Sequence, residues 1–291
     1  MECIDPQAAD TTGVRAQQGR LRPYLKRTTG PKIGPNDINF IIIWVDDIFV
    51  LNDRRHEATV AQDWAALRTA IKVADRQPIS DCLGCKIIRD RPRRQTFLTQ
   101  EKAVRALQAK LGLMEIKGAS DTPMDSNCKL TRADCPSEEE LRTRKEITFH
   151  YQSCTASLCY YVMWTRPDCA YVHSALSRVM DKPSDPACKA LKRALRYLFS
   201  TAHYGLLYDF SEANANRNAG QYGYYDAAFA DCPDTRRSTM GHVIYWDGCP
   251  VAWVSRLNSS VTTSTNHSEY CAGSTCCREC AFQATSRWRW G

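Results

Sequence analysis

The sequence lacks any apolar run long enough to cross a membrane as a helix. The longest run, Phe40–Val45, spans six residues, whereas a membrane-spanning helix needs about 20. The first ten residues contain acidic side chains and no apolar core, so we expect no secretory signal. Together these two absences predict an intracellular protein, cytoplasmic or nuclear, that has no membrane partner.

Glycine and proline are also scarce, at 14 and 13 of 291 residues, which excludes a collagen-like or low-complexity chain. Hydrophobic residues make up 43% and charged residues 24% of the chain, which is the composition of a globular protein with a sizeable core. The 39 Lys and Arg exceed the 32 Asp and Glu and give a net charge of +7. This mild excess allows a polyanionic partner without requiring one.

Cysteine, in contrast, is abundant, with 15 residues. An odd number of cysteines in a long chain without a secretory signal favours reduced thiols over a disulfide framework. The C-x-x-C pairs Cys82/Cys85 and Cys277/Cys280 lie too far apart in sequence for a zinc ribbon. Each pair lies in an apolar, periodic stretch, which favours small buried side chains over a metal site.

The apolar pattern predicts an α+β fold. β-Branched and aromatic residues on both sides of Asp46 and Asp47 predict a hairpin with the two carboxylates at its tip. A helical apolar period predicts a helix over residues 53–77. Further strands are predicted at Cys82–Ile88 and Thr96–Leu98, with a helix after Thr99 and a polar connector over residues 118–145.

The middle of the chain is predicted to be helical, over residues 151–164, over 168–180 and after a cap at Ser184. The last of these helices has an apolar stripe, and its other faces carry Lys189, Lys192, Arg193 and Arg196. Such a basic face can contact a phosphate backbone. A solvated amphipathic helix face is the alternative.

The C-terminal part is predicted to be three strands followed by a helix, an α+β pattern. The strands are expected at residues 222–230, 241–246 and 250–255, and the helix over 266–284. Asp247-Gly248 between two strand-like runs indicates a tight hairpin. Residues 211–221 have the composition of a linker.

Two neighbouring acids at the tip of a hairpin repel each other unless a cation lies between them. Mg²⁺ is usually held by one or two carboxylates and by substrate phosphates, so Asp46 and Asp47 are candidate metal ligands. A solvated turn is the alternative, because Asp is a common turn residue.

Several short motifs occur in the order found in copia-type LTR retrotransposon Pol proteins, which the sequence therefore resembles. The motifs are Trp44-Val-Asp-Asp47, Leu83-Gly84 with Lys86-Ile87, Phe97-Leu-Thr-Gln100, Thr122-Pro-Met-Asp125, Thr165-Arg-Pro-Asp168, Leu176-Ser-Arg178, Lys182-Pro183, Lys192-Arg-Ala-Leu-Arg-Tyr-Leu198, Tyr204-Gly-Leu-Leu-Tyr208, Asp234-Thr-Arg-Arg-Ser-Thr239 and Ser268-Glu-Tyr270. The resemblance covers about residues 38–285.

For the polymerase, the resemblance implies that Asp46 and Asp47 bind catalytic Mg²⁺ together with a third Asp on an earlier palm strand. Asp5, Asp10 and Asp37 precede the pair, and none of them lies in an apolar strand. Trp44 also replaces the usual Tyr of this motif. We therefore expect that the chain alone does not polymerise DNA.

For the ribonuclease H, the resemblance implies two metal ions held by carboxylates on the first strand, on the helix and on a later strand. Asp226 matches the strand carboxylate and Glu269 the helix carboxylate, whereas Ala228 replaces a second Asp of the family pattern. The residues after the helix do not resemble the family's next strand. We expect Asp226 and Glu269 to face each other at metal-bridging distance.

The resemblance implies four segments in the chain: a basic arm without secondary structure (1–37), the C-terminal half of a reverse transcriptase palm with its following hairpin and helix (38–130), a helical connection (131–210) and a truncated ribonuclease H-like unit (211–291). It implies Mg²⁺ or Mn²⁺ as cofactor and an RNA–DNA hybrid or DNA as partner. The alternative is a non-catalytic, truncated relic that binds nucleic acid only through charge. The oligomeric state stays open.

Overall fold

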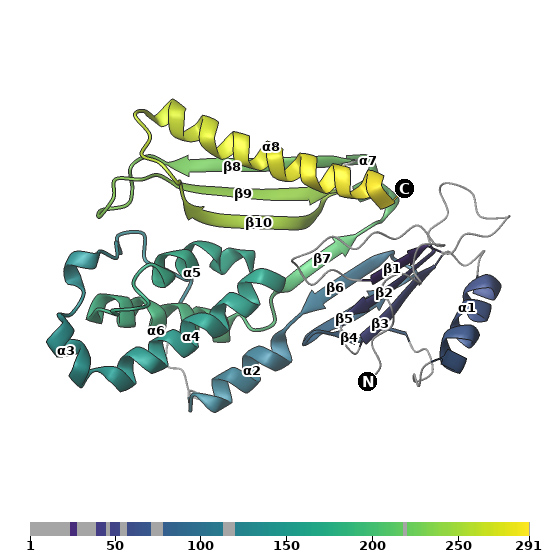
Figure 1. The fold of residues 1–291 in the computed structure, drawn as a ribbon, viewed down its shortest axis with the longest axis horizontal. Coiled ribbons are helices and arrows are strands. Elements are labelled where there is room, and N and C mark those ends of the chain that lie inside the picture. The colour runs from purple at the N-terminus through teal and green to yellow at the C-terminus, as the bar shows by residue number, and fades with distance from the viewer. Residues whose placement is uncertain are drawn as a thin grey trace. The chain divides into compact units, whose positions relative to one another are not determined.

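The computed structural model describes residues 24–27, 39–44, 47–52, 57–70, 78–112, 120–217 and 220–290. The chain forms two compact units, residues 1–77 with 287–291, and residues 78–286. All paired strands are antiparallel, and helices follow or separate them along the chain (Figure 1). The predicted α+β class is confirmed at this level. No helix in the described ranges combines the length and the apolar character needed to span a membrane.

The first unit contains a three-stranded sheet in the order β1-β2-β3 and one helix. Its elements are β1 (Tyr24–Arg27), β2 (Asn39–Trp44), β3 (Asp47–Asn52) and α1 (Glu57–Ala70). The register pairs Trp44 with Asp47, so the predicted hairpin is confirmed as a strand pair. Helix α1 lies within the predicted 53–77, and the rest of that range lies outside the described residues. Strand β1 lies inside the predicted arm, which is therefore wrong for these four residues, because they pair with β2.

The second unit begins with a four-stranded sheet in the order β4-β5-β6-β7. Its strands are β4 (Asp81–Cys82), β5 (Cys85–Asp90), β6 (Gln95–Thr99) and β7 (Gly205–Asp209). Leu83 and Gly84 both have positive φ, 49° and 77°, as a type I′ hairpin turn requires. The sequence pattern predicts a single strand over Cys82–Ile88, where the structure has the β4–β5 hairpin. The helical connection implied for residues 131–210 also contains strand β7. Pairing of β7 with β6 across a long stretch of chain is invisible to a local pattern.

Helices between β6 and β7 form the main hydrophobic core. They are α2 (Glu101–Lys110), α3 (Glu138–Thr143), α4 (Lys145–Trp164), α5 (Ala170–Ser177) and α6 (Asp185–Ser200), with short 3₁₀ turns at Arg132–Asp134 (η3) and Pro167–Cys169 (η4). Ser184 caps α6 by accepting a hydrogen bond from Ala187 N, as predicted.

Part of the predicted polar connector is helical. Ser137 and Glu140 form a reciprocal capping box at the start of α3. This arrangement satisfies backbone N–H groups that the first turn of a helix leaves free. A strongly polar segment can therefore form a short helix without an apolar face.

The C-terminal part confirms the predicted meander. Its elements are α7 (Glu212–Arg217), β8 (Gln221–Ala228), β9 (Thr239–Trp246), β10 (Cys249–Leu257) and α8 (Thr265–Trp290), and the sheet order is β10-β9-β8 (Figure 1). Asp247 and Gly248 have positive φ, as expected for the predicted tight turn. Helix α7 occupies most of the predicted linker, and Asn214 on it donates hydrogen bonds to the carbonyls of Asp209 and Asp247.

Candidate functional site

Helix α8 runs antiparallel to β8 and lies directly over it. Four contacts join, in order, Gln221 to Cys280, Gly223 to Cys276, Tyr225 to Gly273 and Ala227 to Glu269. The strand residue advances by two at each step, while the helix residue moves back by three or four. The odd-numbered side of β8 from 221 to 227 therefore faces α8 along its whole length.

The opposite side of β8 carries Asp226. Successive side chains of a strand point to opposite faces, so Asp226 shares its face with Tyr222 and Tyr224 and lies away from α8. Asp226 is exposed, whereas Glu269 on α8 is half-buried. Asp226 is therefore directed away from the side of β8 that α8 covers, which departs from the expectation that Asp226 and Glu269 face each other.

Glu269 has a backbone partner instead. The Ala227 N–H donates a hydrogen bond to Glu269 Oε1 at 3.3 Å. Strand β8 is the edge of its sheet, and an edge strand leaves every second N–H without a strand partner. The Glu269 carboxylate satisfies one of these donors. The role of Asp226 and Glu269 as ligands of Mg²⁺ or Mn²⁺ stays a prediction.

The carboxylates of Asp46 and Asp47, which the resemblance assigns to the polymerase, are not described by the structure. Asp47 is the first residue of β3, opposite Trp44, and its side chain lies outside the described residues, as does all of Asp46. Their role as metal ligands stays a prediction. Elsewhere, within the described parts of the chain, no group of three or more His, Cys, Asp and Glu side chains is placed to hold a metal ion.

The predicted basic face of α6 is only partly available. Lys189, Lys192 and Arg196 are exposed. Arg193 is half-buried and donates hydrogen bonds to the backbone oxygen and the hydroxyl of Thr122, at 3.3 and 2.9 Å. It also lies 3.8 Å from the Asp125 carboxylate. Arg193 therefore holds the 122–125 loop against α6 and is not a free phosphate contact.

The comparisons with known proteins agree with the resemblance. The chain is 29% identical over 259 residues to the retrovirus-related Pol polyprotein from transposon TNT 1-94 of Nicotiana tabacum, covering 87% of the chain. It is 28% identical over 233 residues to the retrovirus-related Pol polyprotein from transposon RE2 of Arabidopsis thaliana, covering 80% of the chain. The chain is similar to Pol polyproteins of copia-type transposons over most of its length.

The chain spans 19% of the length of the tobacco Pol polyprotein and 15% of the length of the RE2 one. It is also 36% identical over 132 residues, 45% of the chain, to the secreted RxLR effector protein 161 of Plasmopara viticola, and covers 89% of that protein. No protein-family model and no solved structure matches the chain.

One Pol motif, Thr165-Arg-Pro-Asp168, forms a buried polar centre whose role the sequence pattern does not predict. The Arg166 side chain is 2% exposed, and its NH2 lies 2.8 Å from Asp168 Oδ2. Arg166 also donates to the Thr201 hydroxyl and carbonyl, at 2.6 and 3.1 Å. Tyr197 OH donates to Asp168 at 2.8 Å. The motif therefore ties the turn before α5 to the C-terminal end of α6.

The charges of Arg166 and Asp168 stabilise each other. Burial lowers the pKa of Arg166, but the hydrogen bond and the charge of Asp168 raise it by more, so that its pKa is above the ordinary value. Burial and the same carboxylate raise the pKa of Tyr197. Arg166 and Asp168 line an open cleft of about 430 Å³, whose wall also includes Phe97, Tyr204 and Leu206. An Arg followed two residues later by Asp was the only sequence signal for this centre.

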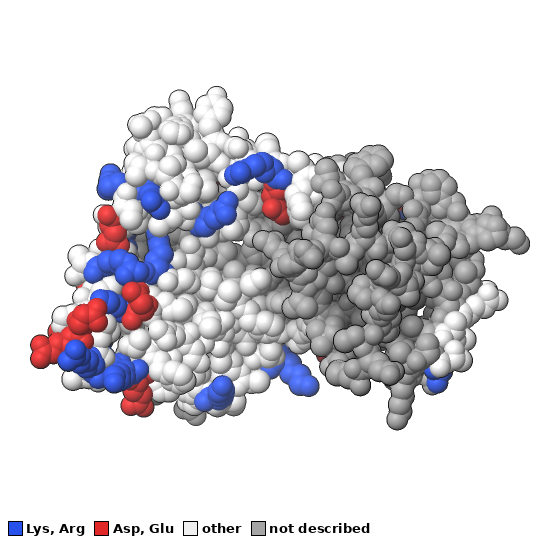
Figure 2. Space-filling view, in the orientation of Figure 1, with Lys and Arg blue, Asp and Glu red and all other residues white. Residues whose placement is uncertain are grey.

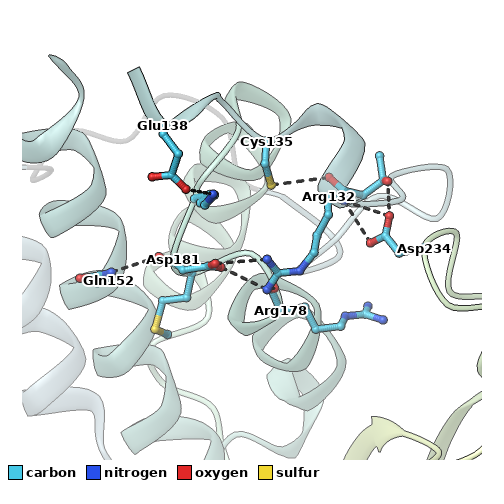
Figure 3. A network of polar contacts seen from close by, with 10 residues as sticks. Arg132, Cys135, Glu138, Gln152, Arg178, Asp181 and Asp234 are labelled. Atoms are coloured by element: carbon cyan, nitrogen blue, oxygen red, sulfur yellow. Dashed lines mark hydrogen bonds and ion pairs between the residues drawn. The ribbon is translucent and has the colours of Figure 1, made fainter. Parts of the chain in front are cut away.

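A second Pol motif, Asp234-Thr-Arg-Arg-Ser-Thr239, also makes structural contacts (Figure 3). The Asp234 carboxylate accepts from the Arg132 backbone N–H at 3.0 Å and from the Thr131 hydroxyl. The Arg132 guanidinium in turn contacts Asp181 at 3.2 Å and the Arg178 carbonyl at 2.9 Å. The loop between β8 and β9 is therefore attached to the helical layer.

The cysteine pairs are only partly the buried side chains that were predicted. Cys82 and Cys85 lie opposite each other on β4 and β5, and burial, with the neighbouring Cys82, raises the pKa of Cys85 to about 11. Cys277 is exposed, which corrects the prediction for this residue. All the cysteines in the described part of the chain are free thiols.

Proposed function

We propose that this chain is a nucleic-acid-binding segment derived from the reverse transcriptase and ribonuclease H region of a copia-type Pol polyprotein, and that it does not cleave or extend nucleic acid by itself. The observation that supports the proposal most directly is the hydrogen bond from Ala227 N–H to Glu269 Oε1. In this bond the Glu269 carboxylate, one of the two implied nuclease ligands, holds the edge of the sheet. Asp226 is directed away from the side of β8 that α8 covers.

Two-metal hydrolysis needs carboxylates that hold the ions on both sides of the scissile phosphate. Strand alternation directs Asp226 away from the side of β8 that Glu269 contacts, which supports an incomplete ligand set. The proposal therefore combines the Pol origin of the chain with the non-catalytic alternative. In a longer Pol product that carries a third acid, Asp46 and Asp47 would be the pair to hold Mg²⁺.

Binding would rely on charge. Lys189, Lys192 and Arg196 are spaced by three and four residues, which places them on one side of α6. All three are exposed, and none has an ion pair within the described part of the chain. On the face drawn in Figure 2, Lys and Arg lie beside Asp and Glu around α3 and form no continuous basic patch among the coloured residues there. A defined basic side of one helix is then the more specific contact for a phosphate backbone.

The test compares the full chain with a variant carrying Lys189→Gln, Lys192→Gln and Arg196→Gln, by fluorescence anisotropy with a labelled RNA–DNA hybrid. The variant should bind more weakly and reduce the log–log salt slope by about 2 to 3, since each phosphate contact contributes about 0.9. A matched control, Lys86→Gln with Lys102→Gln and Lys145→Gln, removes the same charge from other exposed positions and should change the slope little.

Cleavage is followed in the same samples with Mg²⁺ and with Mn²⁺. We expect no metal-dependent cleavage above that of a Glu269→Gln variant. Robust cleavage that this substitution abolishes would overturn the non-catalytic part of the proposal. Equal losses of binding in the two charge variants would overturn the assignment of the contact to α6.

A further inference from the structure

The face of the C-terminal sheet that lies away from α8 carries a cluster of tyrosines, Tyr222, Tyr224 and Tyr245. The rings of Tyr222 and Tyr245 are stacked, with centroids 5.3 Å apart and planes 7° apart. Tyr224 meets both rings edge-on, at 5.8 and 6.0 Å, and is 67% exposed. Burying an aromatic ring is strongly favourable, so a ring this exposed on a rigid strand is available to a partner.

A chain of contacts continues this cluster onto the neighbouring sheet. Tyr245 pairs with Pro250 across β9 and β10. The Pro250 carbonyl accepts a hydrogen bond from Tyr208 OH at 3.0 Å, and the Tyr208 ring stacks on Phe210, 6.5 Å away. Phe210 is 42% exposed. Pro250 thus links two aromatic groups, which together are called here the aromatic strip: Tyr224, Tyr222 and Tyr245 in one group, and Tyr208 and Phe210 in the other.

The Phe210 end of the strip is cationic. The Phe210 N–H donates to the Arg94 carbonyl at 3.0 Å, in the turn between β5 and β6 that also contains Arg91 and Arg93. All three arginines are exposed. Arg93 pairs with Asp90 at 3.7 Å, whereas Arg91 and Arg94 have no ion pair in the described part of the chain. At the other end, Asp226 follows Tyr224 on the same face and adds a negative charge.

We propose that the aromatic strip and the Arg91–Arg94 turn form a binding track for single-stranded nucleic acid, an inference that rests on the proposed function. Unpaired bases stack on exposed aromatic rings without regard to sequence, and cations beside such rings hold the phosphates. The bases of a duplex stack on each other and present no free faces to Tyr224. The charge gradient orients the contact: phosphates lie at the arginine turn, and bases lie on the tyrosines, where Asp226 would repel a phosphate.

The experiment measures anisotropy of the full chain with a labelled oligothymidylate and with a duplex of the same length. Tyr224→Ala should weaken binding of the single strand about tenfold, since stacking contributes about 1–3 kcal/mol per base. Tyr224→Phe keeps the ring and should bind like the parent. Tyr270→Ala is the matched control, because Tyr270 is 80% exposed but lies on α8, on the other side of the sheet. It should leave binding unchanged.

Arg91→Gln with Arg94→Asn tests the cationic end, with Asn chosen because Arg94 has a φ of 57°, which Asn tolerates. This variant should lower the single-strand salt slope by about 1.4, at about 0.7 per phosphate. Asp226→Asn should raise affinity.

Single-strand binding that is unchanged in Tyr224→Ala, or equal losses on duplex and single strand, would overturn the track. If the α6 charge variant still loses hybrid binding in that case, the proposed function survives. If Tyr224→Ala instead dissociates a dimer in sedimentation, the strip is a contact between copies of the chain, and the track is likewise wrong.

Discussion

The backbone N–H of Ala227 donates a hydrogen bond to Oε1 of Glu269 at 3.3 Å, and this contact joins the edge of the C-terminal sheet to the helix that covers it. The residue before Ala227 is Asp226, whose side chain points to the other face. The two carboxylates that the Pol resemblance assigns to one metal site therefore lie at the same stretch of β8, with Asp226 directed away from the side that α8 covers. In this arrangement the Glu269 carboxylate satisfies a backbone donor at the edge of the sheet.

Glu269→Ala should lower the free energy of unfolding by about 1–2 kcal/mol, because a hydrogen bond to a charged acceptor is lost and Ala227 N–H has no new protein partner. Glu269→Gln keeps an acceptor oxygen and should retain most of the stability. Urea unfolding of the three proteins measures the difference. A melting temperature that rises with millimolar Mg²⁺ in the parent, but not in Glu269→Gln or in Asp226→Asn, would instead show that the two carboxylates share a metal.

Gly223→Ala should destabilise the chain by about 1–3 kcal/mol, the usual cost of overpacking. An added Cβ would lie 2.7 Å from Cys276 Sγ, where α8 crosses β8. Gly241→Ala is the control, because Gly241 lies in the neighbouring strand and its added Cβ would meet only Val254 O, at 3.7 Å. Chemical unfolding should separate the two variants. Equal stability in both would mean that α8 does not approach β8 this closely.

Arg166→Met should cost about 3 kcal/mol or more, because it leaves Asp168 without its partner and removes the hydrogen bonds to Thr201. Arg93→Met is the matched control, since its ion pair with Asp90 is 3.7 Å long and its side chain is 77% exposed. Such a surface pair contributes about 1 kcal/mol or less. Thermal unfolding of both variants tests this difference. Similar small losses would argue that Arg166 is solvated in solution.

Stability should fall as the pH drops below about 6.5, in part because of His173. Burial lowers the pKa of this half-buried side chain below its ordinary value of 6.5. The unfolded chain therefore binds a proton first, and stability present at higher pH is lost as the pH falls toward the folded-state pKa. His173→Gln should reduce the difference between unfolding free energies at pH 7 and pH 5. An unchanged difference in His173→Gln would contradict this role.

Local sequence patterns determined much of the secondary structure. The β-branched runs around Asp47, the Asp247-Gly248 turn and the Ser184 cap each lie where the pattern predicted, because these signals depend on residues within one turn or one hairpin. The leucines of α6 are buried as predicted, since a helix with one apolar side has only one way to cover it. The family relationship was also readable, because motif order survives at an identity of 29%.

Only the tertiary structure decided what the motif residues do. Whether Asp226 faces Glu269 depends on which side of β8 the helix covers, and a one-residue change in that register would exchange the two faces. The burial of Arg166 against Asp168 and Thr201, and the pairing of β7 with β6, join segments far apart in the sequence. The sequence by itself determined many of the elements and the resemblance to Pol proteins, because those signals are local. The packing of α8 on β8 decided that Glu269 bonds the backbone of β8 and that Asp226 is directed away from the side that α8 covers.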